Sequence, residues 1–391
     1  MLRLSTSPRA VLATLCVTVT VSYGALYYAF AVLGPSVSER EGWSLTAMTA
    51  GFSAASLVSG IVAIPIGRRI QDHGPRAVMT VGGVLGTIAL VGLAAAPNLP
   101  MFIVAMALTG VAAGGLFYPP AFATLTHWAG ADRVRAITSL TLVAGIASTI
   151  FAPLVTLLDD RIEWRWTYLV LAGIVLVITV PLHYIYLNRP WVPAVSTDGA
   201  ATDRTITRSR QFRMIAIGGF ALTLASFASL IALIPLLKEH GFSAESAAWV
   251  LGIGGAGQVV GRVFYPALTR RLPIAARTAL IAAFLTLPLW LFAAVSDSFA
   301  VLIAISIVAG LGRGLFTLVG ATIVTEIWGP ERYASVNGVL TVPLSLAAAF
   351  GPFAGAAAAD LLGSYASAFA LLGGLATVGA VMLTAGLRTK A

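Results

Sequence analysis

Long apolar stretches recur along the whole chain, and short polar stretches separate them. A helix that crosses a bilayer needs about 20 largely apolar residues. Twelve stretches meet this requirement, and we expect each to form a transmembrane helix in an all-α membrane protein. They span residues 10–37, 44–67, 75–96, 99–127, 134–158, 165–188, 212–237, 244–269, 275–296, 298–327, 333–360 and 364–387. The first is predicted to be a retained helix, because its apolar run continues to Val37 and is too long for a signal peptide.

One polar stretch is longer than the rest and divides the predicted helices into two sets of six. It covers residues 189–211 and is rich in Pro, Ser, Thr, Asp and Arg. We therefore expect an N-terminal six-helix bundle over 1–188, a linker over 189–211 and a C-terminal six-helix bundle over 212–391. The halves also share a motif at an offset of 199, in which Thr126, Gly130, Asp132 and Arg133 match Thr325, Gly329, Glu331 and Arg332. Such internal repeats are typical of secondary transporters.

Composition supports a membrane location. Of the 391 residues, 58% are hydrophobic and 10% are charged, whereas a soluble domain carries about 25% charged residues. The net charge of +9 does not indicate nucleic acid, because the basic residues lie in short loops and form no stripe with interleaved aromatic residues. We expect membrane lipid as a partner and no nucleic acid.

The basic residues also predict the orientation of the helices. If both termini are cytoplasmic, 18 of the 24 Lys and Arg residues fall in cytoplasmic segments, and the outer loops hold Arg40, Arg161, Arg165 and Lys238. Positive residues gather on the cytoplasmic side of membrane proteins. The sequence therefore predicts a multi-pass protein of the cell (inner) membrane, with both termini and the linker in the cytoplasm.

Two arginines, Arg262 and Arg313, lie inside predicted transmembrane helices with no acid beside them. A charge at the centre of a membrane helix costs roughly 2.5–3.5 kcal/mol on insertion scales, so it usually faces a cavity or a partner. An anion supplied from outside would be a suitable partner for both arginines. The alternatives are that Arg262 extends along its helix toward the membrane surface, and that Arg313 bonds to carbonyl groups of a broken helix.

Polar side chains near the arginines are candidates for orienting such an anion. Gln258 lies one turn before Arg262 on the same helical stripe. Tyr27 and Tyr118 each carry a hydroxyl at bilayer depth that needs a partner. We therefore predict a substrate site formed by Arg262, Arg313, Tyr27, Tyr118 and Gln258. A neighbouring helix is the alternative partner for each tyrosine.

The sequence shows no pattern of an enzyme or a metal site. The single cysteine, Cys16, excludes an internal disulfide and a multi-cysteine metal site. The histidines His73, His127, His183 and His240 lie near loops or helix ends, and no nucleophile elbow or paired carboxylates accompany them. We expect no catalytic reaction, no metal and no cofactor.

The loop after the second predicted helix resembles the G-x-x-x-D-x-x-G-x-R loop of the major facilitator superfamily. Gly67, Gly74 and Arg76 match, whereas Gln71 stands in the slot of the acid and Asp72 follows one place later. The resemblance covers essentially the whole chain. It implies two pseudo-symmetric six-helix bundles that work by alternating access. It also implies a gating or structural role for Gly67, Asp72, Gly74 and Arg76, although the acid that helps to lock the two halves in that family is displaced here.

Within the superfamily, the chain is similar to the monocarboxylate and oxalate:formate transporter-like branch. The similar stretches are Tyr23 to Pro35 followed by Gly42-Trp43-Ser44, Ala152-Pro153 with Trp164-Arg165-Trp166, and Arg262 four residues before Pro266. In that branch an arginine of the eighth helix binds the substrate carboxylate, a role that the resemblance implies for Arg262. The oxalate transporter-like pattern also has a lysine in the eleventh helix, but 333–360 contains none, which argues against a dicarboxylate.

The expected function is secondary transport of a small organic anion, with a monocarboxylate as the best candidate. Symport, antiport and proton coupling stay open, and a monomer is expected. One alternative is a multidrug or neutral-solute permease of the same superfamily, and another is a membrane sensor that transports nothing. A multidrug proton antiporter usually needs a buried acid, which we do not find in the twelve stretches. A sugar permease should have more Asn, Gln and Trp in its helices than this chain has.

Overall fold

The computed structural model describes residues 7–193, 199–295 and 298–388. Within these ranges the regular structure is helical. The chain forms two compact units by its internal contacts. Unit 1 comprises the described residues up to 199 together with 328–342, and unit 2 comprises the described residues of 200–327 and 343–391.

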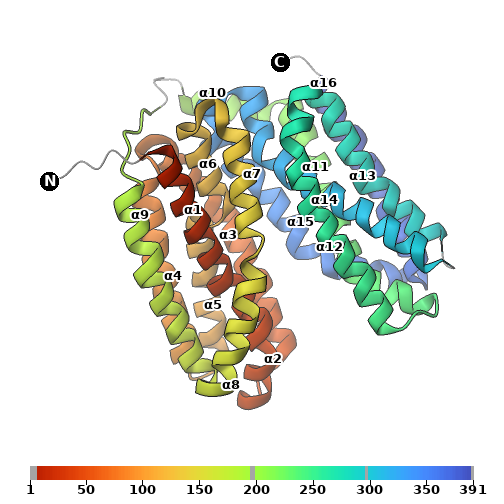
Figure 1. The fold of residues 1–391 in the computed structure, drawn as a ribbon, viewed down its shortest axis with the longest axis horizontal. Coiled ribbons are helices and arrows are strands. Elements are labelled where there is room, and N and C mark those ends of the chain that lie inside the picture. The colour runs from red at the N-terminus through yellow and green to blue at the C-terminus, as the bar shows by residue number, and fades with distance from the viewer. Residues whose placement is uncertain (1–6, 194–198, 296–297, 389–391) are drawn as a thin grey trace. The chain divides into compact units, whose positions relative to one another are not determined.

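Unit 1 is built from helices that pack lengthwise against one another, and Figure 1 shows α1, α4 and α9 side by side. Side chains of Ser7, Ser44 and Asn98 accept the backbone N–H groups at the starts of α1, α3 and α5, which satisfies donors that a helix leaves free. The elements are α1 (Pro8–Tyr23), the π-helical turn η1 (Gly24–Tyr28), α2 (Ala29–Glu41), α3 (Leu45–His73), α4 (Pro75–Ala95), α5 (Leu99–Leu116), α6 (Tyr118–Trp128), the turn η2 (Gly130–Asp132), α7 (Arg133–Ala144), α8 (Ala147–Ile174), the π-helical turn η3 (Val175–Thr179) and α9 (Val180–Tyr186).

Two breaks in unit 1 divide long apolar stretches. The fourth predicted helix breaks at Phe117, whose backbone is extended, between α5 and α6. Pro119 and Pro120 follow at once and cannot continue the hydrogen bonds of α5, which explains the break. Inside α8, Glu163 has φ 66° and ψ 163°, a conformation that residues other than glycine rarely adopt. This turn separates the fifth predicted helix from the sixth.

Unit 2 holds the remaining helices, of which α11, α13 and α16 pack side by side (Figure 1). A short helix, α10, forms in the segment that the sequence predicted to be a linker. The elements are α10 (Gly199–Arg208), α11 (Arg210–Glu239), α12 (Ala244–Arg271), α13 (Ile274–Ala294), α14 (Phe299–Trp328), the turn η4 (Pro330–Arg332), α15 (Tyr333–Leu362) and α16 (Tyr365–Arg388). Of these, η4 and the first turns of α15 belong to unit 1.

All twelve predicted stretches lie on these helices. Among the described residues, ten helical stretches are long and apolar enough to cross a membrane. The number is lower than twelve for two reasons. Gly130–Tyr186 is one continuous stretch of 57 residues that holds two of the predicted helices. Helix α12 is not among the ten, because its glycines, Gln258 and Arg262 make it less apolar.

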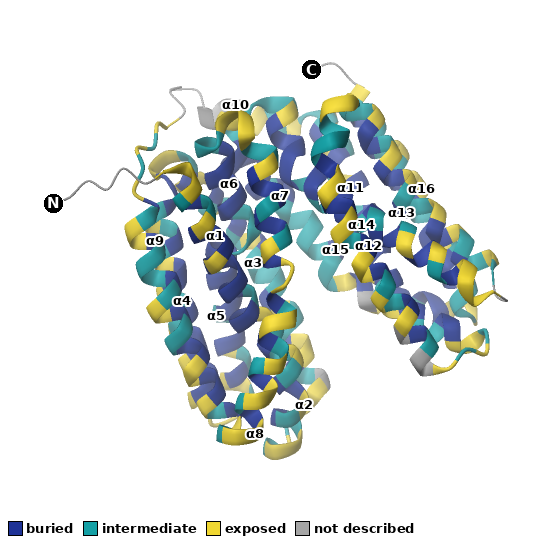
Figure 2. Ribbon diagram, viewed as in Figure 1, coloured by how far each residue is buried: buried dark blue, intermediate teal, exposed yellow. Residues whose placement is uncertain are grey.

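The outer faces of the helices carry large apolar side chains, as expected for contact with lipid. Figure 2 shows exposed positions along the outer faces and buried positions along the inner ones. Val104, Val177 and Phe353 are 70%, 71% and 72% exposed. In water such surfaces would cause association, whereas a bilayer solvates them.

Candidate functional site

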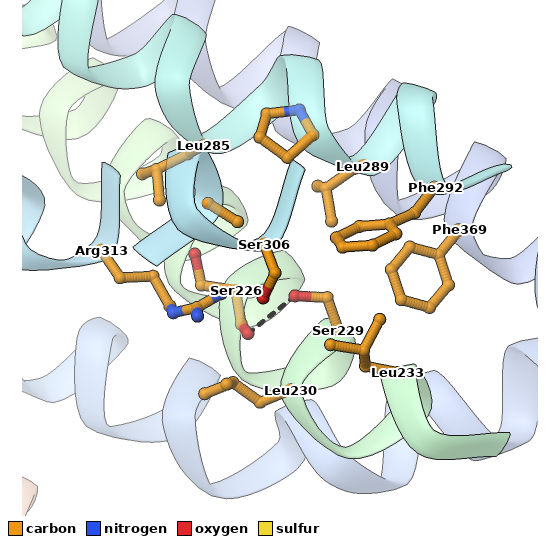
Figure 3. Close-up of a pocket in the computed structure, with 12 residues that line it drawn as sticks. Ser226, Ser229, Leu230, Leu233, Leu285, Leu289, Phe292, Ser306, Arg313 and Phe369 are labelled. Atoms are coloured by element: carbon orange, nitrogen blue, oxygen red, sulfur yellow. Dashed lines mark hydrogen bonds between the residues drawn. The ribbon is translucent and has the colours of Figure 1, made fainter. Parts of the chain in front are cut away.

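Arg313 lines a pocket inside unit 2 together with three serines (Figure 3). Ser226 and Ser229 come from α11, and Ser306 and Arg313 come from α14. All three serines are buried. The rest of the lining is apolar and comes from α11, α13, α14 and α16: Leu230, Leu233, Leu285, Pro288, Leu289, Phe292, Ala309 and Phe369. The free space has room for little more than a water molecule.

The hydrogen bonds of this pocket leave the guanidinium of Arg313 with unused capacity. The Ser306 hydroxyl donates to the carbonyl oxygen of Val250 at 2.7 Å, and the Ser229 hydroxyl donates to that of Ser226 at 2.9 Å. Figure 3 shows the guanidinium of Arg313 directed toward Ser226 and Ser306. Its Nε is buried without a hydrogen-bond partner, and none of the ion pairs found among the described residues includes it. The pocket is therefore positively charged and can donate further hydrogen bonds.

Close packing of α12 on α14 positions Arg313. A Cβ at Gly310 would collide with the carbonyl oxygen of Gly254, and one at Gly314 with that of Gln258. Both glycines therefore allow the two helices to pack closely. The Nη2 atom of Arg313 lies 3.3 Å from the position that a Cβ of Gly254 would occupy. The missing side chain at Gly254 therefore also makes room for the guanidinium.

Arg262 lies on the same helix as Gln258 and near a polar network that the sequence analysis missed. Its side chain is buried, with 7% exposed. One turn later, the hydroxyl of Tyr265 shares a hydrogen bond of 2.6 Å with that of Thr322 on α14. The guanidinium of Arg277, on α13, lies 5.4 Å from the centre of the Tyr265 ring. Arg277 also donates to both carboxylate oxygens of Glu326 on α14, at 2.6 and 2.8 Å.

Two acids, one in the last turn of the tenth predicted helix and one just after the fifth, pair with arginines. Glu326 lies in the last turn of α14 and pairs with Arg277 near the start of α13. Asp159 on α8 is 9% exposed and pairs with Arg40 on α2 at 3.3 Å. Each acid is matched by an arginine far away in the sequence. Charge counting along the chain could not show this.

Tyr27 and Tyr118 belong to an aromatic cluster in unit 1. Tyr23 connects them, because its ring stacks on Phe117 with centroids 3.9 Å apart and lies 4.9 Å from the ring of Tyr118 and 6.3 Å from that of Tyr27. Tyr27 is 36% exposed. The cluster joins the π-helical turn η1 to the break between α5 and α6. Local departures from α-helix are frequent at functional sites in membrane proteins and in enzymes.

The predicted gating loop is largely helical in the structure, because it comprises the last turns of α3, Gly74 and the first residues of α4. A Cβ at Gly67 would collide with the carbonyl oxygen of Ala334 at the start of α15. Gly74 has φ +80°. Arg76 donates from Nε to the carbonyl oxygen of Tyr184 at 2.8 Å and from Nη1 to Oδ1 of Asn188 at 3.0 Å. Asp72 is exposed.

The structure thus gathers the predicted site residues in two groups. Tyr27 and Tyr118 lie together in unit 1. Gln258, Arg262 and Arg313 lie on the packed pair α12 and α14 in unit 2. Among the described residues, no group of three His, Cys, Asp or Glu side chains is placed to hold a metal ion.

Known proteins resemble this chain both in sequence and in fold. A family model described as Major Facilitator Superfamily matches residues 15–296 and 215–390. Human monocarboxylate transporter 11 is 26% identical over 340 residues, which cover 84% of this chain and 72% of that protein. Rat monocarboxylate transporter 13 is 24% identical over 330 residues, which cover 82% of this chain and 75% of that protein. The crystal structure of the Escherichia coli fucose:proton symporter FucP aligns with a TM-score of 0.75 at 15% identity, covering 97% of this chain and 98% of that one.

Proposed function

Because this chain belongs to the Major Facilitator Superfamily, we propose that it is a secondary transporter that carries a small organic anion, a monocarboxylate, by alternating access. It is an all-α, multi-pass membrane protein with the fold of that family. The names of the relatives support a carboxylate as substrate. We assign it no catalytic reaction and no cofactor.

Arg313 is the observation that carries the proposal. Arg313 is half-buried, but its Nε is fully buried without a hydrogen-bond partner. Leaving such a donor unpaired costs about 1–3 kcal/mol, and more for a charged group, so a sequence that keeps one gains something from it. The three serines add hydroxyl groups that can turn toward a carboxylate, and the guanidinium offers a flat pair of donors that matches it. A bound carboxylate would supply the missing negative charge.

The chemistry of the lining favours a small anion with one charge. Apart from Arg313, the side chains that line the pocket are neutral. A second carboxylate there would be stranded among leucine and phenylalanine side chains at a high cost. The free space is small, so a ligand larger than water enters only when the surrounding helices move, as alternating access requires.

The other predicted residues receive supporting roles in this proposal. Arg262 and Gln258 lie on the helix that packs against Arg313, and we assign to them the attraction and orientation of the carboxylate. Tyr27 and Tyr118 offer aromatic faces and hydroxyl groups from unit 1. Gly67, Asp72, Gly74 and Arg76 form the gating loop. We also propose that the protein is a monomer in the cell (inner) membrane, with both termini in the cytoplasm. Flux measurements with and without a pH gradient address proton coupling.

Uptake into liposomes tests the proposal. Purified protein would be reconstituted and assayed for counterflow of radiolabelled acetate, L-lactate and a neutral sugar. Arg313→Gln should lower the rate of carboxylate exchange by about ten- to a hundredfold, the effect of losing a charge-assisted hydrogen bond. Arg313→Lys keeps the charge but loses the planar fork, and should retain part of the rate. Arg271→Gln, at an exposed position of α12, is the matched control and should transport like the parent.

Two outcomes would reject the proposal. Carboxylate exchange at the parent rate in a monodisperse Arg313→Gln protein would show that the pocket does not bind the anion. Exchange of the neutral sugar, with no exchange of either carboxylate, would favour the neutral-solute alternative.

A further inference from the structure

The short segment that follows α9 is held tightly against unit 1 by Trp191. The indole Nε1 of Trp191 donates to the carbonyl oxygen of Gln71 at 3.0 Å. Its ring stacks on His127, at the end of α6, with centroids 3.9 Å apart and an angle of 21° between the rings. One side chain thus links the last turn of α3 to the end of α6.

Gly74 provides the space for this ring. A Cβ at Gly74 would lie 3.0 to 3.2 Å from atoms of the Trp191 side chain, closer than ordinary contacts. Gly74 also has φ +80°, which favours glycine at this position. The glycine of the loop motif is therefore required twice, once for the turn and once for the contact with Trp191.

The neighbours of Trp191 reinforce the attachment. The carbonyl oxygen of Pro190 accepts a hydrogen bond of 3.1 Å from Nε1 of Trp128. The guanidinium of Arg189 lies 5.9 Å from the centre of the Trp128 ring. Asn188 accepts from Arg76, as described above. Four successive residues, 188–191, are thus held by the junction of α3 and α4 and by the end of α6.

Trp191 also lies where the start of α15 meets these elements. It lines a small pocket with Gln71, Ala123, His127, Val192, Pro330, Glu331 and Ala334, all within unit 1. Next to this pocket α3 and α15 touch backbone to backbone, because a Cβ at Gly338 would lie 2.6 Å from the carbonyl oxygen of Ala63. The ring therefore covers the junction of α3, α6 and α15.

We propose that Trp191 is a latch of the transport cycle, which holds the α3–α4 junction 71–76, the end of α6 and residues 330–334 at the start of α15 together in one state. Position 71 carries an amide, and the acid at 72 is exposed, so neither side chain brings a carboxylate to this junction. The indole bonds instead to the main chain of Gln71. Residues 189–191 are the first residues of the predicted linker 189–211, so the latch is part of that linker. The proposal is independent of the identity of the transported anion.

Cysteine labelling measures the latch directly. Ala334 is 6% exposed and lines the pocket under Trp191, so Ala334→Cys in a Cys16→Ala background reports the opening of the junction. The protein would be held in nanodiscs, where a maleimide reaches both faces. Trp191→Ala should raise the labelling rate by about tenfold, since a stacked ring pair and one hydrogen bond contribute roughly this factor to an equilibrium. Trp191→Phe keeps a ring for stacking and loses the N–H donor, so its labelling rate should lie between those of the parent and of Trp191→Ala.

Two controls separate a latch from a general loss of packing. Trp166 is 61% exposed in the same unit, and Trp166→Ala should leave the labelling of Ala334→Cys unchanged. Ala172 is 3% exposed on α8, and Ala172→Cys should stay unlabelled in every variant. An unchanged rate in Trp191→Ala would overturn the proposal. Labelling of both reporters in Trp191→Ala would overturn it as well, because it would show that Trp191 only supports the fold.

Discussion

Glu326→Gln should destabilise unit 2 by removing the negative partner of Arg277. The side chain of Arg277 is 3% exposed, and its Nη2 donates to both carboxylate oxygens of Glu326. An amide at 326 can accept a hydrogen bond but cannot balance the charge. Arg277 cannot adapt by losing a proton, because the guanidinium stays protonated in proteins. The Tyr265 ring remains as a weaker partner at 5.4 Å.

The magnitude follows from the burial of the two partners. Breaking a fully buried ion pair by removing one partner costs about 3–5 kcal/mol. Glu326 keeps 22% of its side chain exposed, so water reaches that end of the pair. We therefore expect a loss of about 2–3 kcal/mol. For a domain of 150–250 residues, each kcal/mol lowers Tm by about 2–4 °C, which gives a fall of about 5–10 °C.

Thermal unfolding of the purified protein in detergent measures this effect. The set comprises Glu326→Gln, Arg277→Met and the double variant Arg277→Met/Glu326→Leu. Both single variants should lose stability, whereas the double variant should return close to the parent, because an apolar pair needs no compensation. Asp360→Asn, at an exposed position in the same unit, is the control. A double variant whose loss of stability equals the sum of the two single losses would refute the reasoning, since it would show no coupling between the two residues.

Three further predictions follow from the orientation, the packing and the second arginine. In a cysteine-free background, Pro97→Cys should react with an impermeant maleimide added outside cells and Ala131→Cys should not; the opposite pattern would reverse the orientation. Gly310→Val should lower Tm by several degrees and abolish anion exchange, whereas Gly320→Val, which enters open space on the same helix, should behave like the parent. Arg262→Gln should weaken the binding of acetate, measured by thermal shift, by about ten- to a hundredfold. Unchanged affinity would remove Arg262 from the anion site.

The helices could be predicted from the sequence because their signals are local. Apolar stretches of sufficient length set the spans, and Ser7, Ser44 and Asn98 mark three of the starts. Pro119 and Pro120 are a local signal for the break between α5 and α6. The turn at Glu163 was expected in position, but its left-handed conformation has no signal in the residue type.

The contacts of the site could not be predicted in the same way. The side chain of Arg313 is directed toward Ser226, which lies 87 residues earlier in the chain. The local sequence around either residue gives no signal for this contact. Arg277 and Glu326 are 49 residues apart, and each looks like an ordinary charge at the end of a helix. Trp191 stands in a polar stretch, where a lone aromatic residue gives no periodic pattern. Its one signal was its large apolar ring in a segment otherwise suited to water.

The glycine contacts between α12 and α14 restrict how Arg262 and Arg313 can move relative to each other. Backbones that touch at Gly254, Gly310 and Gly314 leave no side chains between them that could change rotamer and let the helices slide. We therefore expect α12 and α14 to move as one rigid body during transport. Arg262 on α12 and Arg313 on α14 would then keep a constant distance from each other from the binding of the anion to its release. The anion would then stay near two arginines whose separation is constant, while the other residues that contact it change during the transport cycle.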